Sequence, residues 1–291
     1  MKSLTKLFIP IALETLCYML AGMVDTMMLS TVGDNAVGAV GTANTYINVF
    51  IIMFSIVSSG MIAVMTQYIG AKRIGVAYQA RQLGAVLNLV LGVALSGFLF
   101  VFSGNVLEIV GVAPLLMDYA KTYLKIVGGF CFVNALIPIF SSYLRAFGYT
   151  KQPLIATVLS NVLNLCLNAV FLFVFHSGVA GVAAATVISR FLNLAIVIVA
   201  SKLLVKADKD PERLGNKEVF AQIIKVGLPS AMETAFYNVA MTLTIRFLNQ
   251  MDDAGMNVTA RSYAAQIANF SYCVGAALAQ ANAILTGWRI G

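Results

Sequence analysis

The chain has 291 residues, of which 60% are hydrophobic and only 11% are charged, and its formal net charge is +7. Because a soluble domain carries about 25% charged residues, this composition excludes a soluble globular protein, a disordered chain, a nucleic-acid binder and a secreted disulfide scaffold. We therefore expect an all-α integral membrane protein.

Eight stretches are long and apolar enough to cross a hydrocarbon layer, which takes about 20 residues. In chain order they cover residues 7–30, 36–69, 83–103, 119–144, 153–176, 178–204, 219–249 and 258–288. The second and the last two exceed the required length, so we expect them to be tilted or to have an aqueous end. The first is too long for a signal peptide and contains two carboxylates, so it is predicted to remain as a helix.

Basic residues mark alternate connections between these stretches. The connections after the first, third, fifth and seventh contain no Lys or Arg, whereas the other connections and the two chain ends hold Lys2, Lys6, Lys72, Arg73, Arg81, Arg145, Lys151, Lys202, Lys206, Lys209, Arg213, Lys217 and Arg289. This positive-inside pattern predicts a multi-pass protein of the cytoplasmic (plasma) membrane with its N-terminus in the cytoplasm. The pattern also explains the basic surplus without a nucleic-acid partner.

Three short segments recur in the same order. PIALETLCY (10–18) resembles PSAMETAFY (229–237), TANTY (42–46) resembles TARSY (259–263), and IG (69–70) recurs at 290–291. Three ordered matches support a duplication. Because six predicted helices, an even number, precede the second copy, the two copies are predicted to be parallel repeats related by an axis along the membrane normal.

A hydrophilic segment, KADKDPERLGNKE, divides the chain. We expect six helices over residues 1–205, a cytoplasmic linker over 206–218 and two helices over 219–291. The second copy is much shorter than the first, which predicts about two thirds of a twelve-helix protein.

Three carboxylates lie inside predicted spans: Glu14, Asp25 and Glu233. A charge at the bilayer centre costs at least about 2.5 kcal/mol, so each should face a cavity or a partner, or be protonated. Eleven residues separate Glu14 from Asp25, a rotation of about 1,100°, which places both on one helix face. Asp25 is interpreted either as a coupling-ion residue or as a structural hydrogen-bonding residue. Glu233 either meets a cationic substrate, with Tyr237 nearby, or packs at an interface.

The fifth predicted helix carries a polar stripe, Asn161, Asn164 and Asn168, at positions i, i+3 and i+7. The stripe either bonds neighbouring helices or joins Asp25 in binding a hard cation or relaying a proton. Arg190 on the sixth helix needs a partner, for which Asp25 and Glu14 are the candidates; an ion pair and a substrate role both stay open.

Several motifs together resemble the multidrug and toxic compound extrusion (MATE) family: IPIALETLCYMLAGMVDTMMLSTVG, TQYIGAKRIG, YLRAFGYTKQP, GVAGVAAATVISR and VGLPSAME, in this order. The resemblance implies two six-helix lobes around a central cleft and export of organic cations in exchange for Na⁺ or H⁺, with no other cofactor. On this basis the chain is expected to hold the complete N-terminal lobe and the first two helices of the C-terminal lobe, and the full-length protein is expected to be a monomer.

The resemblance also implies site residues. In one branch of the family the ion site joins an Asp on the first helix to an Asn and an Asp on the fifth and a Thr on the sixth. The matching positions are Asp25, Asn164, Asn168 and Thr186, so the second carboxylate is an amide here. Asp25 and Asn164 are the expected ligands if the ion is Na⁺. Contact with the organic cation is expected from Glu14, Arg190, Glu233 and Tyr237.

Three other functions are alternatives to antiport. A flippase for lipid-linked oligosaccharides shares the two-lobe plan but is expected to line its cavity with more Arg and Lys residues. A membrane-embedded enzyme would need a catalytic cluster or nucleotide-binding loop, and the sequence contains no such motif. A fragment that does not transport remains the last alternative.

Overall fold

The computed structural model describes residues 4–109, 112, 114–205, 213–251 and 256–291, and these residues are almost entirely helical. The elements are α1 (Leu4–Leu29), α2 (Asp34–Gly70), α3 (Ile74–Ile109), α4 (Pro114–Tyr123), the π-helical turn η1 (Leu124–Gly128), α5 (Cys131–Ala146), α6 (Lys151–Ala169), the π-helical turn η2 (Val170–Val174), α7 (Gly178–Leu204), α8 (Asn216–Met251) and α9 (Met256–Ile290). All eight predicted helices are therefore present, and the sixth has the predicted bounds.

Two predicted helices differ from the structure. The span predicted at 119–144 is not one straight helix, because α4 and η1 meet α5 at a bend of 45°. The bend follows the pair Gly128 and Gly129, where a wide π turn replaces regular helical hydrogen bonds. The span predicted at 83–103 is too short, since α3 begins nine residues earlier at Ile74. Its extra turns are anchored by Gln79, whose amide donates to Leu214 O at 2.8 Å and to Asn216 Oδ1 at 2.6 Å.

Five helices of the described residues are long and apolar enough to cross a membrane, and the bent pair makes a sixth. They are α1, residues 53–70 of α2, α3, α6 with η2, and α7, with α4–η1–α5 as the bent span. The chain is thus multi-pass, with six of the eight predicted spans meeting this standard within the described residues.

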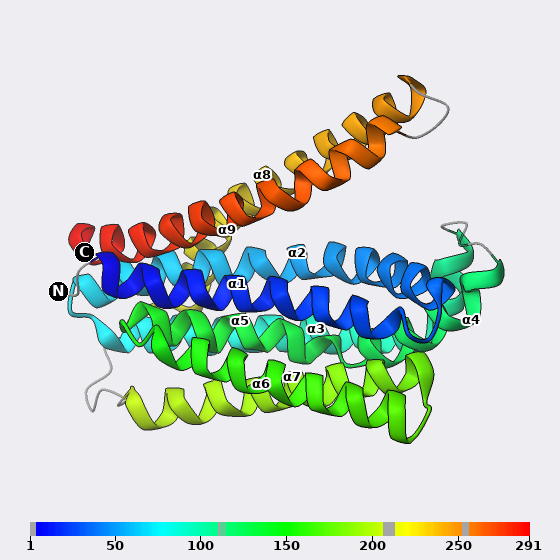
Figure 1. Ribbon diagram of the computed structural model, residues 1–291. Coiled ribbons are helices and arrows are strands. Elements are labelled where there is room, and N and C mark those ends of the chain that lie inside the picture. Colours follow the sequence, from blue (N-terminus) through cyan, green and yellow to red (C-terminus); the bar gives the residue numbers. More distant parts are fainter. Residues whose placement is uncertain (1–3, 110–111, 113, 206–212, 252–255) are drawn as a thin grey trace.

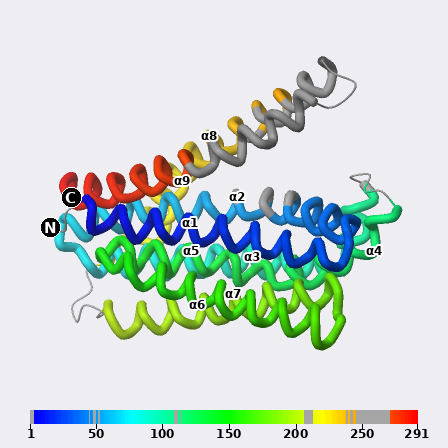
Figure 2. Tube along the Cα trace, in the orientation of Figure 1, coloured from blue at the N-terminus to red at the C-terminus, as the bar shows by residue number. Residues whose placement is uncertain are grey.

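Helices α1 to α7 lie together as an elongated bundle, and α8 and α9 form a pair that lies beside α1 and α2 at the end where both termini are found (Figure 1). Figure 2 shows α9 next to α1 at this end along the chain trace. We call this end the basic end, because Lys6, Arg73, Arg81, Arg145, Lys151 and Lys202 are all found there.

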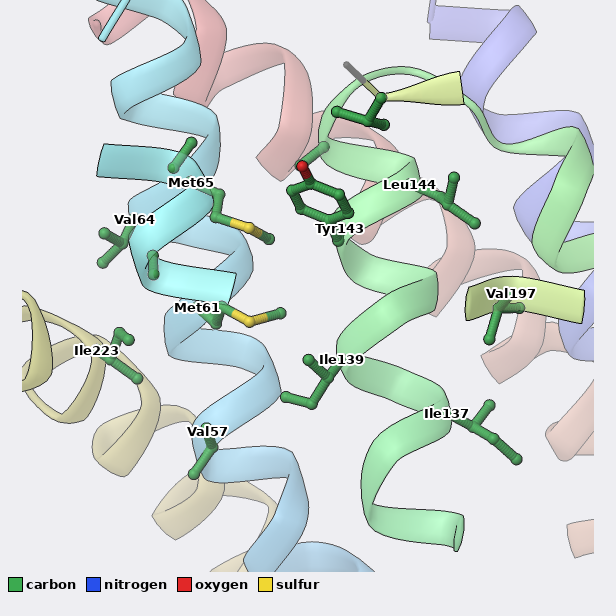
Figure 3. Close-up of a cluster of buried hydrophobic side chains, with 14 of the residues drawn as sticks. Val57, Met61, Val64, Met65, Ile137, Ile139, Tyr143, Leu144, Val197 and Ile223 are labelled. Atoms are coloured by element: carbon green, nitrogen blue, oxygen red, sulfur yellow. The ribbon is translucent and has the colours of Figure 1, made fainter. Parts of the chain in front are cut away.

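The largest apolar cluster lies between α2, α3, α5 and α7 near the basic end. Met61 and Met65 of α2 lie opposite Ile139 and Tyr143 of α5, as Figure 3 shows. Ile223 of α8 belongs to the same cluster. The first turns of α8 are therefore packed into the core of the α1–α7 bundle.

Contacts between the α1–α7 bundle and α8–α9 occur in equivalent pairs, in agreement with the internal duplication. Gly70 lies against the backbone of Trp288, and Gly291 lies against the carbonyl of Gln67. The Ile-Gly repeat relates Gly70 to Gly291 and, by the same shift, Gln67 to Trp288, so these two contacts are equivalent. Similarly, the packing of α1 on α9 corresponds to that of α8 on α2. This symmetry supports two parallel copies around a central α2–α9 contact.

Close packing of α2 on α8 depends on two glycines. A side chain on Gly60 would meet the carbonyl of Ile223, and one on Gly227 would meet the carbonyl of Ile56. Small residues let membrane helices approach closely enough for such backbone contact.

We expect Gly60→Val to separate α2 from α8, because a backbone atom rather than a flexible side chain would have to move. Overpacking of this kind costs about 1 to 3 kcal/mol, which thermal unfolding in detergent would detect. Gly97→Val is the matched control, since Gly97 on α3 has open space around it. Equal melting temperatures for the two variants would contradict this account of the α2–α8 contact.

Candidate ion site and inter-lobe contact

Asp25 lies against two asparagines of α6. The amide of Asn168 donates to Asp25 Oδ1 at 2.6 Å and also to Asn164 Oδ1 at 3.2 Å. Asn168 is fully buried, and Asn164 is only 8% exposed. The structure therefore brings together three of the four residues predicted for ion coupling.

The oxygen atoms of this cluster suit a hard cation or a proton. Asn168 Oδ1 is buried and has no hydrogen-bond partner among the described residues. A half-turn of the Asn168 amide would bring this oxygen beside the Asp25 carboxylate and Asn164 Oδ1, which gives the carboxylate and amide oxygens that hard cations prefer. The described residues contain no group of three or more His, Cys, Asp and Glu side chains. The cluster thus has one formal negative charge, which fits a monovalent cation better than a divalent one.

Thr186, the fourth predicted residue, is positioned differently. Its hydroxyl donates to Val182 O at 2.9 Å within α7, and it also lies within hydrogen-bonding reach of Tyr123. Among the described contacts, none joins it directly to Asp25, Asn164 or Asn168. Thr186 therefore lies at the contact between α4 and α7 and is not part of the Asp25 cluster.

Arg190 is enclosed in the bundle one turn after Thr186. Its Nη1 is buried and has no hydrogen-bond partner among the described residues, and its charge acts on Asp25. Three residues further along α7, Asn193 donates to Thr157 Oγ1 at 3.5 Å and to Ser160 Oγ at 3.3 Å. Arg190 is therefore partly buried near the Asp25 cluster, with one donor that has no partner among the described residues.

Glu14, predicted as a partner of Arg190 or of the substrate, pairs instead with Arg145. Arg145 Nη2 donates to Glu14 Oε1 at 2.6 Å, and the two side chains are 13% and 4% exposed. Arg145 Nη1 donates to Gln280 Oε1 of α9 at 2.9 Å. This cluster therefore ties α1 and α5 to α9 at the basic end. In the sequence, Arg145 indicated only the membrane topology, and no sequence feature indicated a role for Gln280.

The third asparagine of the stripe has a separate role. Asn161 donates to the backbone carbonyl of Cys17 at 2.9 Å and so binds α6 to α1. The two readings of the stripe thus apply to different members, since Asn161 bonds helices whereas Asn164 and Asn168 reach Asp25.

The predicted substrate residues of α8 lie on its surface. Glu233 is exposed, and Tyr237, one turn later, is 55% exposed. Neither has a bond to the ion cluster. Thr244, the repeat counterpart of Asp25, donates to Ala240 O within α8, so the two copies differ chemically.

Sequence and structure comparisons identify the family. The profile of the MatE family matches residues 10–170. The chain belongs to this family. Its members are transporters rather than enzymes.

Two similar relatives are longer than this chain. An uncharacterized transporter of Bacillus subtilis, YisQ, is 34% identical over 99% of this chain and 64% of its own length. A probable multidrug resistance protein of Thermotoga maritima, NorM, is 27% identical over 85% of this chain and 54% of its own length. The chain therefore spans less than two thirds of either relative.

Solved structures share the fold. A MOP superfamily transporter from Pyrococcus furiosus superposes with a TM-score of 0.85 at 22% identity, covering 99% of this chain and 65% of that one. A multidrug resistance MATE family transporter in an outward-facing conformation gives a TM-score of 0.84 at 22% identity, with the same coverage.

We expect Arg145→Met to destabilise the protein by about 3 to 5 kcal/mol, because it leaves the buried Glu14 carboxylate without its counter-ion. The double variant Glu14→Met/Arg145→Met removes both charges and should recover most of that loss. Arg289→Met, at the exposed end of α9, is the control. Thermal unfolding of the four proteins measures the effect, and a double variant no more stable than Arg145→Met would show that the pair is not coupled.

Proposed function

We propose that the protein carrying these residues is a secondary antiporter that exports organic cations in exchange for Na⁺ or H⁺. The observation that carries the proposal is the Asp25 cluster, in which a carboxylate and two buried amides meet inside the helical bundle. An ionisable group in this position is costly and is retained in membrane proteins chiefly on ion pathways.

The cluster offers a simple way to exchange ions. In the structure the Asn168 amide donates to Asp25, which is the arrangement expected for an ionised carboxylate. A proton on Asp25, or Na⁺ beside it, would remove the need for this donor, and the free Asn168 oxygen would serve as a ligand. Because Arg190 is enclosed nearby and its charge acts on Asp25, it would help to release the bound cation.

A change in helix packing caused by ion binding would be transmitted along α1. The same helix holds Asp25 toward one end and Glu14 toward the other, where Arg145 reaches both Glu14 and Gln280 of α9. A change in how α1 packs on α6 would therefore alter the contact between the bundle and α8–α9. Movement of these two parts against each other is the expected basis of alternating access.

The exposed surface of α8 supports an organic cation as substrate. Glu233 supplies a negative charge, and Phe236 and Tyr237 are 66% and 55% exposed beside it. Aromatic faces attract cations by about 0.5 to 2 kcal/mol. The flippase alternative is less well supported, because Arg145 is paired with Glu14 and a pyrophosphate would need several basic residues rather than chiefly Arg190.

We expect Asp25→Asn to abolish cation-driven efflux while leaving membrane insertion and expression unchanged. The amide keeps the shape of the side chain but can neither bind a proton nor supply charge to Na⁺. Efflux of a fluorescent organic cation from vesicles, driven by an imposed Na⁺ or H⁺ gradient, provides the measurement. Unaltered efflux by this variant would refute the proposed coupling.

Asn164→Leu and Asn161→Leu make a matched pair on one helix face. The first should lower the apparent affinity for the coupling ion by about tenfold, the effect of about 1.4 kcal/mol, with little loss of thermal stability. The second should lower stability through the lost bond to Cys17 O and leave ion affinity nearly unchanged. If both variants lose ion affinity and stability to the same degree, the stripe acts only in helix packing.

A further inference from the structure

A cavity of about 490 Å³ lies at the basic end between the first turns of α1 and α6. It is lined by Thr5, Lys6, Ile9, Pro10, Gly148, Tyr149, Thr150, Lys151 and Gln152. None of these lining residues is acidic, and two are exposed lysines. The cavity is at least 15 residues along α1 from Asp25, so it is separate from the ion cluster.

Three features of the cavity favour an anion with a hydroxyl group. Lys6 and Lys151 place two positive charges on it, one from each helix. The N-terminal turn of α6 opens into it, and Thr150 makes no capping bond there but donates to Lys6 O at 3.3 Å. Backbone N–H groups of such a turn lack helical partners and attract anions. Gln152 also lines the cavity, and its Oε1 is buried without a partner among the described residues. Rotation of this side chain toward the cavity would let the oxygen accept a hydroxyl proton.

A second, apolar groove lies deeper on the same two helices. It has a volume of about 210 Å³, and its lining comprises Cys17, Leu20, Ala21 and Val24 of α1 with Val158, Asn161, Val162, Asn164 and Leu165 of α6. Between the two cavities, Leu13 and Ile155 are 46% and 51% exposed. Because α1 and α6 both start at the basic end (Figure 1), the groove lies farther from that end than the cavity does, on the same two helices.

The separation of the two cavities matches the layers of a bilayer. Seven residues from Pro10 to Cys17 rise about 10 Å along α1. The polar layer on each side of a bilayer is about 5 to 8 Å thick, given a hydrocarbon core of about 30 Å within a total of 40 to 45 Å. A phosphate held by the lysines would therefore direct its acyl chain into the apolar groove.

We propose that the α1–α6 surface is a binding site for an acidic glycerophospholipid with a hydroxylated headgroup, such as phosphatidylglycerol. Its phosphate contacts Lys6, Lys151 and the start of α6, a headgroup hydroxyl donates to Gln152 Oε1, and one acyl chain follows the groove to Val162. The site does not depend on the proposed export activity, since all its contacts are with the lipid itself.

Native mass spectrometry of the detergent-purified protein would measure the binding of dioleoyl phosphatidylglycerol, phosphatidic acid and phosphatidylcholine. We expect phosphatidylglycerol to bind most tightly. The variant Lys6→Ala/Lys151→Ala should bind it about 30-fold more weakly, as expected for the loss of two lysine contacts with acidic lipid. The control Lys202→Ala removes an exposed lysine at the same end but outside the cavity, and it should bind as the unmodified protein does.

Two further variants test the headgroup and the chain separately. Gln152→Leu should bind phosphatidylglycerol no better than phosphatidic acid, which lacks the headgroup hydroxyls. Val162→Trp should weaken dioleoyl but not dihexanoyl phosphatidylglycerol. Unchanged phosphatidylglycerol binding in the double lysine variant would overturn the proposal. Competition by inorganic phosphate as strong as by the lipid would also overturn it, because the cavity would then be a simple anion site.

Discussion

The parallel contact between α1 and α6 is the constraint on which the rest of the structure depends. Three hydrogen bonds hold these helices together: Thr150 to Lys6 O, Asn161 to Cys17 O and Asn168 to Asp25. The partners are separated by 144, 144 and 143 residues, so the helices run side by side without a shift in register. In a membrane, apolar side chains give little preference for another helix over lipid, so such polar bonds decide which helices pair and at what height.

This pairing also explains why the sequence was informative about the ion cluster and less so about its surroundings. An Asp in the first apolar stretch and an Asn stripe in the fifth are rare within membrane spans, and the resemblance to the MATE family placed them in one site. Arg145 could not be recognised in this way, because a basic residue at the end of a span already satisfies the positive-inside pattern. Only the fold shows that it turns inward to Glu14 and Gln280. The internal repeat, in contrast, predicted two parallel copies, and the equivalent contacts of Gly70 and Gly291 agree with that prediction.

The bend between η1 and α5 was missed for a related physical reason. Hydropathy measures whether a segment can enter the bilayer, and α4, η1 and α5 are together long and apolar enough to do so. A π turn changes hydrogen bonding without changing composition, so only backbone geometry reveals it. The turn has a consequence for the site, since it is followed by the segment that carries Arg145 and preceded by Tyr123, which lies near Thr186.

Two kinds of interface therefore coexist in this chain, and they suit different tasks. Within the bundle, α1 and α6 are joined by polar bonds at three depths, each of which would leave a buried group unpaired if the helices separated. Between the bundle and α8–α9, glycines pack against backbone and Ile223 of α8 enters the core near the basic end. Two hydrogen bonds across this contact end on neutral groups, since Tyr68 donates to Gln222 and Arg145 donates to Gln280. Separation of the two parts would leave no charge unpaired, because Arg145 keeps Glu14. If the two parts move against each other, as the proposed antiport requires, this contact is the one expected to change, whereas α1 and α6, with the ion cluster and the proposed lipid surface between them, are expected to move as one unit.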